Sequence, residues 1–246
     1  MPTSSHYSSQ GGSQLLKIKK MHKYFRGRHV LKGINVQVNA REVAVIIGSS
    51  RFDNSLLLRC VNFLDTIDEG EIWFDGKKIT ETQRNIGMVN RHFNLFPHKT
   101  MLDHVMEAPI IFHHGTRERA VVEGMHALNK VGLREKAFAY PKNLSDSEKQ
   151  KLAIARVLVL KPKIMLFDYP TAMLNKQSAD KVFDVVKILA EEGMTMIVTT
   201  DDIDFIRTTA KRILLLEKGL IVEDSPVETF FNKPKTTMGK QFLKNM

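Results

Sequence analysis

Residues 43–64 contain an apolar segment, a short turn and a second apolar segment in the spacing of a phosphate-binding loop. Such a loop follows the pattern GxxxxGK[ST], in which glycines bring backbone N–H groups to the phosphates, a lysine neutralises them and a hydroxyl binds magnesium. Gly48 and Ser55 stand at the first and last positions of the pattern. The second glycine position holds Asp53 and the lysine position holds Asn54, so the frame is present without its positive charge.

Three consecutive side chains, those of Arg51, Phe52 and Asp53, stand where the pattern has or tolerates glycine. A non-glycine residue in the left-handed backbone region costs about 1–2 kcal/mol, so we expect the loop to adopt another shape. The carboxylate of Asp53 would repel a triphosphate, and the amide of Asn54 cannot neutralise one. Arg51 does carry a cation, but at a different position from the lysine of the pattern.

The elements that must position this loop can be predicted from hydrophobic periodicity. Alternation across 15–47 predicts β-structure, and the continuous apolar run at 43–47 predicts a buried strand that leads into the loop. Further strands are predicted at 69–80 with a turn at Asp75-Gly76, at 85–89, 163–168 and 195–200, and in a hairpin at 212–225 that turns near Lys218-Gly219. Helices are predicted at 55–64, 101–139, 145–160 and 176–192, with short helices near the C-terminus. This alternation predicts an α/β fold with a parallel core sheet, an added antiparallel β layer and a helical subdomain.

Composition limits the remaining function classes. The chain has 246 residues, 43% of them hydrophobic, which is enough for one large domain or two small ones. It has no apolar run of the length that a membrane helix needs, and its polar first residues, 1–14, are predicted to form a disordered tail. The single cysteine, Cys60, excludes an internal disulfide, and its apolar neighbours predict a buried, inert thiol. These features favour a cytoplasmic location.

The net charge of +10 favours anionic partners such as nucleic acid, an acidic membrane face or phosphate ligands. The 37 Lys and Arg residues are scattered, however, and no aromatic-interleaved basic patch is visible. A basic nucleic-acid-binding module therefore remains an alternative, and we expect no nucleic-acid partner.

Several ordered stretches carry a resemblance to a known family. They are VLKGINVQV before the loop, SLLLRCVNFLD after it, then IGMV, HFNLFPH, VMEAPI, YPKNLS, KLAIARVL, KPKIMLFD and GMTMIV. In this order and spacing they resemble the ATP-binding subunit of ABC transporters, in the class that serves importers of polar amino acids. The resemblance covers residues 15–246 and implies a P-loop NTPase-like fold of the ABC ATPase type, with a helical insert at about 92–160.

The resemblance also implies which positions would contact a nucleotide. Phe25 matches the aromatic residue that stacks on adenine, with Tyr24 beside it, and Gly48, Ser50 and Ser55 are the loop residues that agree with the family. Ser55 and Asp168 match the residues that bind magnesium. We expect no cofactor beyond weak residual binding of Mg/ATP by these groups, because an isolated hydroxyl and carboxylate hold the ion weakly without phosphate oxygens.

Four catalytic positions of the family carry other residues in this chain. Asn54 replaces the loop lysine, Arg91 replaces a glutamine that senses metal and attacking water, and Tyr169 replaces the catalytic glutamate. Asp201 replaces the switch histidine. A tyrosine, with a usual pKa of about 10, cannot act as a general base near neutrality, and losing a positioned base typically slows a reaction by about 10²–10⁴.

The family's signature sequence, LSGGQ, is matched by residues 144–148, which read LSDSE. In the family this helix start donates N–H groups to the γ-phosphate held by a partner subunit. Asp146 and Glu148 place negative charge there, which satisfies the helix dipole and repels a phosphate. Ser145 and Glu148 also form the S-x-x-E pattern of a capping box, which predicts a well-formed helix start.

Because the departures concentrate at nucleotide positions while the strands stay apolar, we interpret the chain as an ABC-type protein that has lost its ATPase activity and most of its ATP binding, a pseudoenzyme. Its residual role would be to bind a membrane permease or to act as a scaffold. Residues 92–110 would bind the permease, because Phe93 and Phe96 offer aromatic anchors there. Its location would then be the inner face of the membrane. A homodimer is a further partner that the resemblance implies. The alternative is an ATP-hydrolysing subunit of an amino-acid importer that tolerates these changes.

Overall fold

The structure, a computed structural model, describes residues 13–83, 85–113 and 116–244. The chain divides into two compact units. The first unit comprises Met1–Gln83 and Gly193–Met246, and the second comprises Arg84–Glu192. The predicted tail at 1–14 lies almost wholly outside the described residues, and β1 begins at Gln14.

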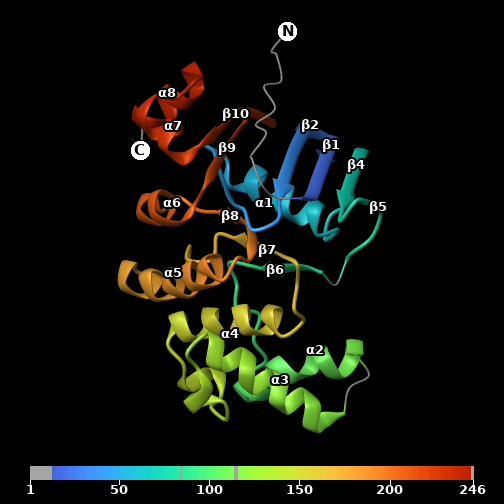
Figure 1. The fold of residues 1–246 in the computed structure, drawn as a ribbon, viewed down its shortest axis with the longest axis vertical. Coiled ribbons are helices and arrows are strands. Elements are labelled where there is room, and N and C mark those ends of the chain that lie inside the picture. Colours follow the sequence, from blue (N-terminus) through green and yellow to red (C-terminus); the bar gives the residue numbers. More distant parts are fainter. Residues whose placement is uncertain (1–12, 84, 114–115, 245–246) are drawn as a thin grey trace. The chain divides into compact units, whose positions relative to one another are not determined.

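The first unit contains a four-stranded antiparallel sheet in the order β2-β1-β4-β5 (Figure 1). Its strands are β1 Gln14–Phe25, β2 Arg28–Asn39, β4 Glu69–Phe74 and β5 Lys77–Ile79. The central strand β1 places Ile18 opposite Val36 on one side and opposite Ile72 on the other. All three side chains are buried, so the alternating pattern of the sequence corresponds to one apolar face.

Two-residue turns close the hairpins of this unit, and both residues of each turn have positive φ. The turns are Arg26-Gly27, Asp75-Gly76 and Lys218-Gly219. Positive φ at both central positions is the geometry of a type I′ turn, whose twist matches that of antiparallel strands. The turns predicted at Asp75-Gly76 and Lys218-Gly219 are therefore confirmed.

The first unit also contains a mostly parallel set of strands, in the order β10-β9-β3-β8. The strands are β3 Val43–Ile47, β8 Thr195–Thr199, β9 Arg212–Glu217 and β10 Leu220–Pro226. Every residue of β3, β8 and β9 is buried, as predicted for β3 and β8, and the buried residues of β9 include the charged Arg212 and Glu217. The helices of this unit are α1 Arg51–Val61, α6 Ile203–Thr209, α7 Val227–Asn232 and α8 Thr237–Lys244.

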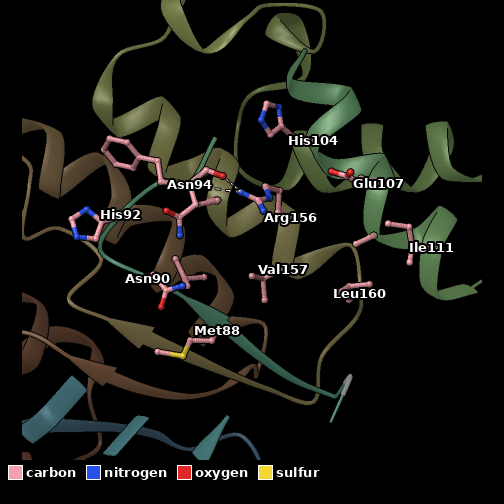
Figure 2. A pocket seen from close by; sticks show the side chains of 14 residues that line it. Met88, Asn90, His92, Asn94, His104, Glu107, Ile111, Arg156, Val157 and Leu160 are labelled. Carbon is pink, nitrogen blue, oxygen red and sulfur yellow. Dashed lines mark hydrogen bonds between the residues drawn. The ribbon is translucent and has the colours of Figure 1, made fainter. Parts of the chain in front are cut away.

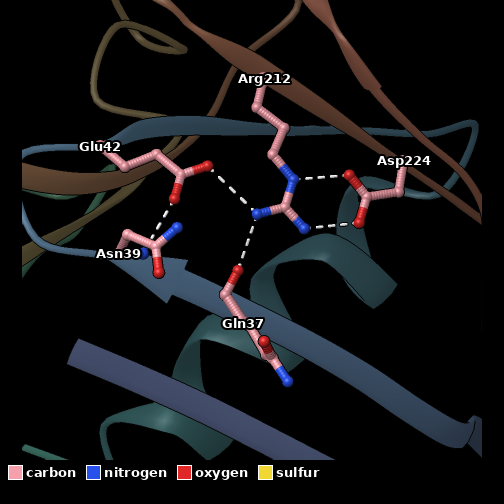
Figure 3. Close-up of polar contacts among 5 residues, drawn as sticks. All are labelled: Gln37, Asn39, Glu42, Arg212 and Asp224. Atoms are coloured by element: carbon pink, nitrogen blue, oxygen red, sulfur yellow. Dashed lines mark hydrogen bonds and ion pairs between the residues drawn. The ribbon is translucent and has the colours of Figure 1, made fainter. Parts of the chain in front are cut away.

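A buried arginine connects the two strand sets of the first unit (Figure 3). Arg212 at the start of β9 donates to both carboxylate oxygens of Asp224, to Glu42 Oε1 at 3.1 Å and to the carbonyl of Gln37 at 2.7 Å. Burial opposes the charge of Arg212, but the hydrogen bonds and charges of Asp224 and Glu42 outweigh it and raise the pKa of Arg212. Removing Arg212 would leave the buried carboxylate of Glu42 uncompensated, which typically costs about 3–5 kcal/mol.

The second unit combines two parallel strands, β6 Ile86–Val89 and β7 Ile164–Asp168, with a group of helices (Figure 1). The helices are α2 Met101–His113, α3 Arg117–Lys130, α4 Asp146–Leu158 and α5 Lys176–Glu191, with single 3₁₀ turns at Arg134–Lys136 and Pro141–Asn143. Helix α4 packs against α2, α3, α5 and β6 and so organises the unit. None of the described helices is long and apolar enough to cross a membrane.

Candidate functional site

The loop after β3 is shorter than the sequence pattern predicts. Helix α1 begins at Arg51, and the hydroxyl of Ser50 caps it by accepting a hydrogen bond from the N–H of Asp53 at 3.2 Å. The expectation of a helix that starts at 55 is therefore wrong at its first turn. Residues 51–53 have no positive φ, so the expected left-handed strain is also absent there. The serine cap lets non-glycine residues enter the helix, since it satisfies an N–H group that would otherwise lack a partner.

A carboxylate from a distant strand contacts the start of this loop. Glu217, the last residue of β9, accepts from the N–H of Ser49 and from its hydroxyl, both at 2.7 Å. A Cβ at the preceding residue, Gly48, would lie 2.1 Å from the carbonyl oxygen of Leu216, so only glycine fits there. The first glycine of the pattern therefore serves a close approach of β9, and the N–H after it binds a protein carboxylate.

The next three side chains of the pattern are buried. Asp53 is 8% exposed, Asn54 is 0% exposed and Ser55 is 4% exposed. The loop-lysine position is thus occupied by an interior amide. Ser55, the position that the resemblance assigns to magnesium, lies in the first turns of α1 rather than in an open loop.

Arg51 contacts the position that the resemblance assigns to the switch histidine. Its Nε and Nη2 atoms lie 2.8 Å and 2.6 Å from Oδ2 of Asp201. Asp201 follows β8, and β8 is a parallel neighbour of β3, so the carboxyl ends of both strands lie at one edge of the sheet. Two positions that are 150 residues apart therefore meet in an exposed ion pair.

The predicted adenine-stacking residue lies beside the same loop. The ring of Phe25 meets that of Phe52 edge-on at 5.0 Å between centroids, and the guanidinium of Arg26 lies 5.5 Å from the Phe25 ring. The neighbouring Tyr24 is exposed and stacks on His29 at 4.2 Å. Phe25 and Tyr24 therefore form two separate aromatic pairs at the end of the β1–β2 hairpin.

In the second unit, the catalytic positions follow two adjacent parallel strands. Arg91 comes after β6, and Asp168 and Tyr169 come at and after the end of β7. Asp168 and Tyr169 are both buried, and Tyr169 has a φ of 45°. A bulky residue in this left-handed region stores about 1–3 kcal/mol of strain, and such strain is frequent at functional sites. Ser55 and Asp168, the predicted metal pair, belong to different units.

The signature segment forms the predicted capping box at the start of α4. The hydroxyl of Ser145 accepts from the N–H of Glu148 at 3.4 Å, and Oε2 of Glu148 accepts from the N–H of Ser145 at 2.9 Å. Lys136 adds an ion pair to Oε1 of Glu148 at 2.5 Å. Burial opposes the charge of Glu148, but the hydrogen bonds from Lys136 and Ser145 outweigh it and lower the pKa of Glu148.

The second unit also holds a cavity of about 290 Å³ (Figure 2). Its lining residues are Met88, Val89, Asn90, His92, Phe93, Asn94, His104, Glu107, Ala108, Ile111, Ala153, Arg156, Val157 and Leu160. Arg156 on α4 fixes one wall, because its Nη1 donates to the carbonyl of Asn94 at 2.8 Å. Of the two predicted anchors, Phe93 lines the cavity, whereas Phe96 is exposed and lies outside the lining set.

His104 on α2 hydrogen-bonds to the segment that follows residues 92–94 of the cavity wall. Its Nε2 accepts from the N–H of Phe96 at 2.8 Å, and its Nδ1 lies 2.8 Å from the carbonyl oxygen of Thr100. A ring nitrogen that accepts and a second one that donates define a neutral imidazole. Burial, the largest cause, lowers the pKa of His104 and keeps it in that form.

Comparison with known proteins identifies the family. A family model described as ABC transporter matches residues 31–172. The glutamine transport ATP-binding protein GlnQ of Geobacillus stearothermophilus is 44% identical over 93% of this chain and 98% of its own length. The chain belongs to the ABC transporter family. The arginine transport ATP-binding protein ArtM of Bacillus subtilis is 39% identical over 94% of this chain and its whole length.

Solved structures agree with the family assignment. A dimeric post-hydrolysis state of an ATP-binding cassette bound to ADP and Pi superposes with a TM-score of 0.76 at 30% identity, covering 87% of this chain and 99% of that one. Together with the observed strands and helices, this confirms the predicted ABC ATPase fold, with its mixed sheets and helical subdomain.

The same comparisons correct the functional interpretation. The prediction of a pseudoenzyme with an inactive ATPase is contradicted, because the similar proteins are named as ATP-binding subunits of amino-acid transport and match this chain nearly from end to end. They favour the alternative, an ATP-hydrolysing importer subunit. Sequence reasoning also missed Glu217 and His104, whose only sequence signals are a charged residue at the end of an apolar run and a histidine within an apolar helix.

Proposed function

We propose that this chain is the ATP-hydrolysing subunit of an importer for polar amino acids. The observation that carries the proposal is the similarity over 93–94% of the chain to proteins named for the transport of glutamine and arginine. As in such transporters, we propose that it acts as a homodimer attached to a permease at the inner face of the membrane.

For the nucleotide, we propose that Phe25, Gly48, Ser50 and Ser55 contribute contacts at their family positions. Ser50 would contact the nucleotide from its position as the cap of α1, and Ser55 would contact it from the first turns of that helix. At their family positions, the hydroxyl of Ser55 in the first unit and the carboxylate of Asp168 in the second are each proposed as an oxygen ligand for magnesium, the kind of ligand that this ion prefers. The bound ion would supply charge neutralisation at the phosphates.

The loop fits a triphosphate only in part, and four family positions carry other residues, namely Asn54, Arg91, Tyr169 and Asp201. The N–H of Ser49 already donates to Glu217, so a phosphate would have to compete with a protein carboxylate for it. The departures predict a lower affinity for ATP than the family's own residues would give.

We propose that the permease docks at residues 92–110 and at the cavity of the second unit. Ile111, Val157 and Leu160 provide an apolar wall, and Arg156 and Glu107 provide charges of both signs beside it (Figure 2). An amphipathic helix with one apolar face fits a groove of this kind.

The test is magnesium-dependent ATP hydrolysis by the purified chain, alone and with its permease, beside the variant Asp168→Asn. Removing this carboxylate takes away a proposed magnesium ligand, so we expect hydrolysis by the unaltered chain that exceeds the variant's rate. Equal rates in the two proteins, with both folded by circular dichroism, would contradict the proposed activity. Co-purification with the permease, and its loss in Ile111→Asp, tests the docking surface separately.

A further inference from the structure

The first unit contains a second cavity, of about 330 Å³, and most of the residues around it are of basic types. It is lined by Arg28, His29, Val30, Lys32, Asp53 and Lys218. Its volume is at the lower end of the range for small-molecule sites. Three of the lining residues carry a positive charge and one carries a carboxylate, so the lining residues have a net positive charge at neutral pH.

Backbone contacts hold the two lysines of the lining, Lys32 and Lys218, on neighbouring segments. The N–H of Lys32 on β2 donates to the carbonyl of Gly219 at 2.8 Å. A Cβ at Gly219 would lie 2.0 Å from the carbonyl oxygen of Val30, so the β9–β10 turn lies directly against β2. Lys218, the residue before this glycine, is therefore held against the strand that carries Arg28 and Lys32.

Lys218 occupies an unfavourable backbone position for a lysine. Its φ is 52°, in the left-handed region that asparagine and glycine tolerate best. In a two-residue type I′ turn the usual residues at this position are Asn, Asp and Gly. Neither backbone preference nor burial explains a lysine here, since the side chain is exposed.

The charges of the cavity are not balanced by ion pairs. Within the described residues, Arg28, Lys32 and Lys218 form no ion pair at 4.0 Å or less. Clustered like charges raise the free energy of the folded state, and an anion bound among them lowers it. Asp53, which is 8% exposed, is the one acidic residue of the lining and leaves most of this charge unneutralised.

We propose that this cavity binds phosphate groups through Arg28, Lys32 and Lys218. Guanidinium and ammonium groups form charge-assisted hydrogen bonds with phosphate oxygens, and an arginine can do so with two parallel bonds. The cavity adjoins the predicted phosphate loop, because Asp53 belongs to both. It places positive charge near a loop whose lysine position holds Asn54. Phosphate binding here requires neither an adenine nor hydrolysis, so it does not rest on the proposed ATPase activity.

The phosphate groups could come from a free polyphosphate or from a nucleotide, and the experiment separates these sources. Thermal melting is measured with sodium pyrophosphate at constant ionic strength, without divalent metal, and in parallel with ATP. The test variant is Lys218→Asn, which removes one cation while placing a better-suited residue at a left-handed position. The matched control is Lys20→Asn, because Lys20 is also exposed and has a φ of 45°, but does not line the cavity.

We expect pyrophosphate to raise the melting temperature of the unaltered chain and of Lys20→Asn. Losing one charge-assisted contact should weaken binding to Lys218→Asn about tenfold. Asp53→Asn removes the competing carboxylate and should strengthen binding. Absence of a rise in the unaltered chain, or an equal rise in both lysine variants, would overturn the proposal.

A second variant, Lys32→Gln, repeats the test from β2 in case the turn variant alters the hairpin. If pyrophosphate stabilises the unaltered chain more than Lys218→Asn, the measurement with ATP identifies the source of the phosphate. If Lys218→Asn weakens stabilisation by ATP and by pyrophosphate alike, the cavity takes nucleotide phosphates. If only the pyrophosphate effect falls, the cavity takes free phosphates and lies apart from the nucleotide site.

Discussion

The starts of helices α1 and α4 differ in the origin of the carboxylate that contacts them. Both helices begin after a capping serine, Ser50 in the first unit and Ser145 in the second. At α4 the carboxylate is local, because Glu148 lies three residues after its cap. At the loop before α1 it is distant, because Glu217 lies 168 residues from the Ser49 that it contacts. A local contact follows from short-range sequence, whereas a distant one depends on strand order.

The two helix starts also differ in their electrostatics. The resemblance to ABC proteins implies that phosphate contacts both regions. In this chain the loop before α1 and the start of α4 each already have a protein carboxylate that accepts a hydrogen bond from a backbone N–H group. The two carboxylates are held differently. Glu148 gains Lys136 as a cationic partner on the same unit, while Glu217 receives two hydrogen bonds from one serine. This difference can be tested by changing each site alone.

The largest expected effect comes from restoring the loop. The double variant Asp53→Gly and Asn54→Lys removes a repelling carboxylate and adds a cation where the family has one, so we expect ATP to bind more than tenfold more tightly. Isothermal titration calorimetry with MgATP measures this. The corresponding change at α4, Glu148→Gln, should leave the affinity of the single chain unchanged, and an equal gain there would remove the distinction between the two helix starts.

Next in size is the loss of the distant carboxylate. Glu217→Ala leaves the N–H and hydroxyl of Ser49 without their acceptor, and we expect the free energy of unfolding to fall by about 2–3 kcal/mol. Urea denaturation followed by circular dichroism measures the change. Glu217→Gln is the control, because its amide oxygen can still accept one of the two hydrogen bonds and should retain part of the stability. A loss equal to that of the alanine variant would indicate that the charge, not the hydrogen bond, matters.

The local cap should be worth less. Glu148→Ala removes half of the capping box, and we expect a loss of about 1 kcal/mol in the free energy of unfolding. Because the folded-state pKa of Glu148 is lowered from its usual value, its contribution is complete above that usual value, about 4.5, and disappears as the pH falls through the lower folded-state pKa. Denaturation of the unaltered chain and of the variant is measured between pH 3 and 7, in steps of about half a pH unit. The difference in the free energy of unfolding between the two proteins should shrink toward acid pH. A difference that does not change with pH would contradict this assignment.

The smallest effect is expected for the exposed ion pair between Arg51 and Asp201. Such pairs contribute about 0–1 kcal/mol because solvent screens them. A double-mutant cycle with Arg51→Ala and Asp201→Ala, measured by denaturation, should give a coupling energy within this range that declines in high salt. A larger, salt-independent coupling would show that the pair is part of the structural core of the loop.

Much of the fold could be predicted from residue patterns, and the reasons are local. The turns at Asp75-Gly76 and Lys218-Gly219 follow from glycine in the second position, and the strands β3, β7 and β8 follow from continuous apolar runs. The start of α1 could not be predicted in this way. The pattern of a phosphate loop suggests a helix that begins at Ser55, whereas the helix that Ser50 caps begins at Arg51, four residues or about one turn earlier.

The candidate site was predictable in part. The resemblance assigned positions to Arg51 and Asp201, but nothing in the sequence indicated that they pair, since their contact depends on β3 and β8 being neighbours. The capping box at Ser145 was visible because both of its members lie within one helical turn. The basic cavity was invisible, because its cations come from β2 and from a turn far along the chain.

The sequence by itself determined the family, the buried strands, the hairpin turns and the cap of α4, because apolar periodicity and short-range hydrogen bonds act between residues that are near one another in the chain. Only the tertiary structure decided that Glu217 contacts Ser49, that Arg51 meets Asp201, and that the lysines at 32 and 218 line one cavity. These contacts join residues on different strands, so their distance is set by sheet order and register rather than by spacing along the chain.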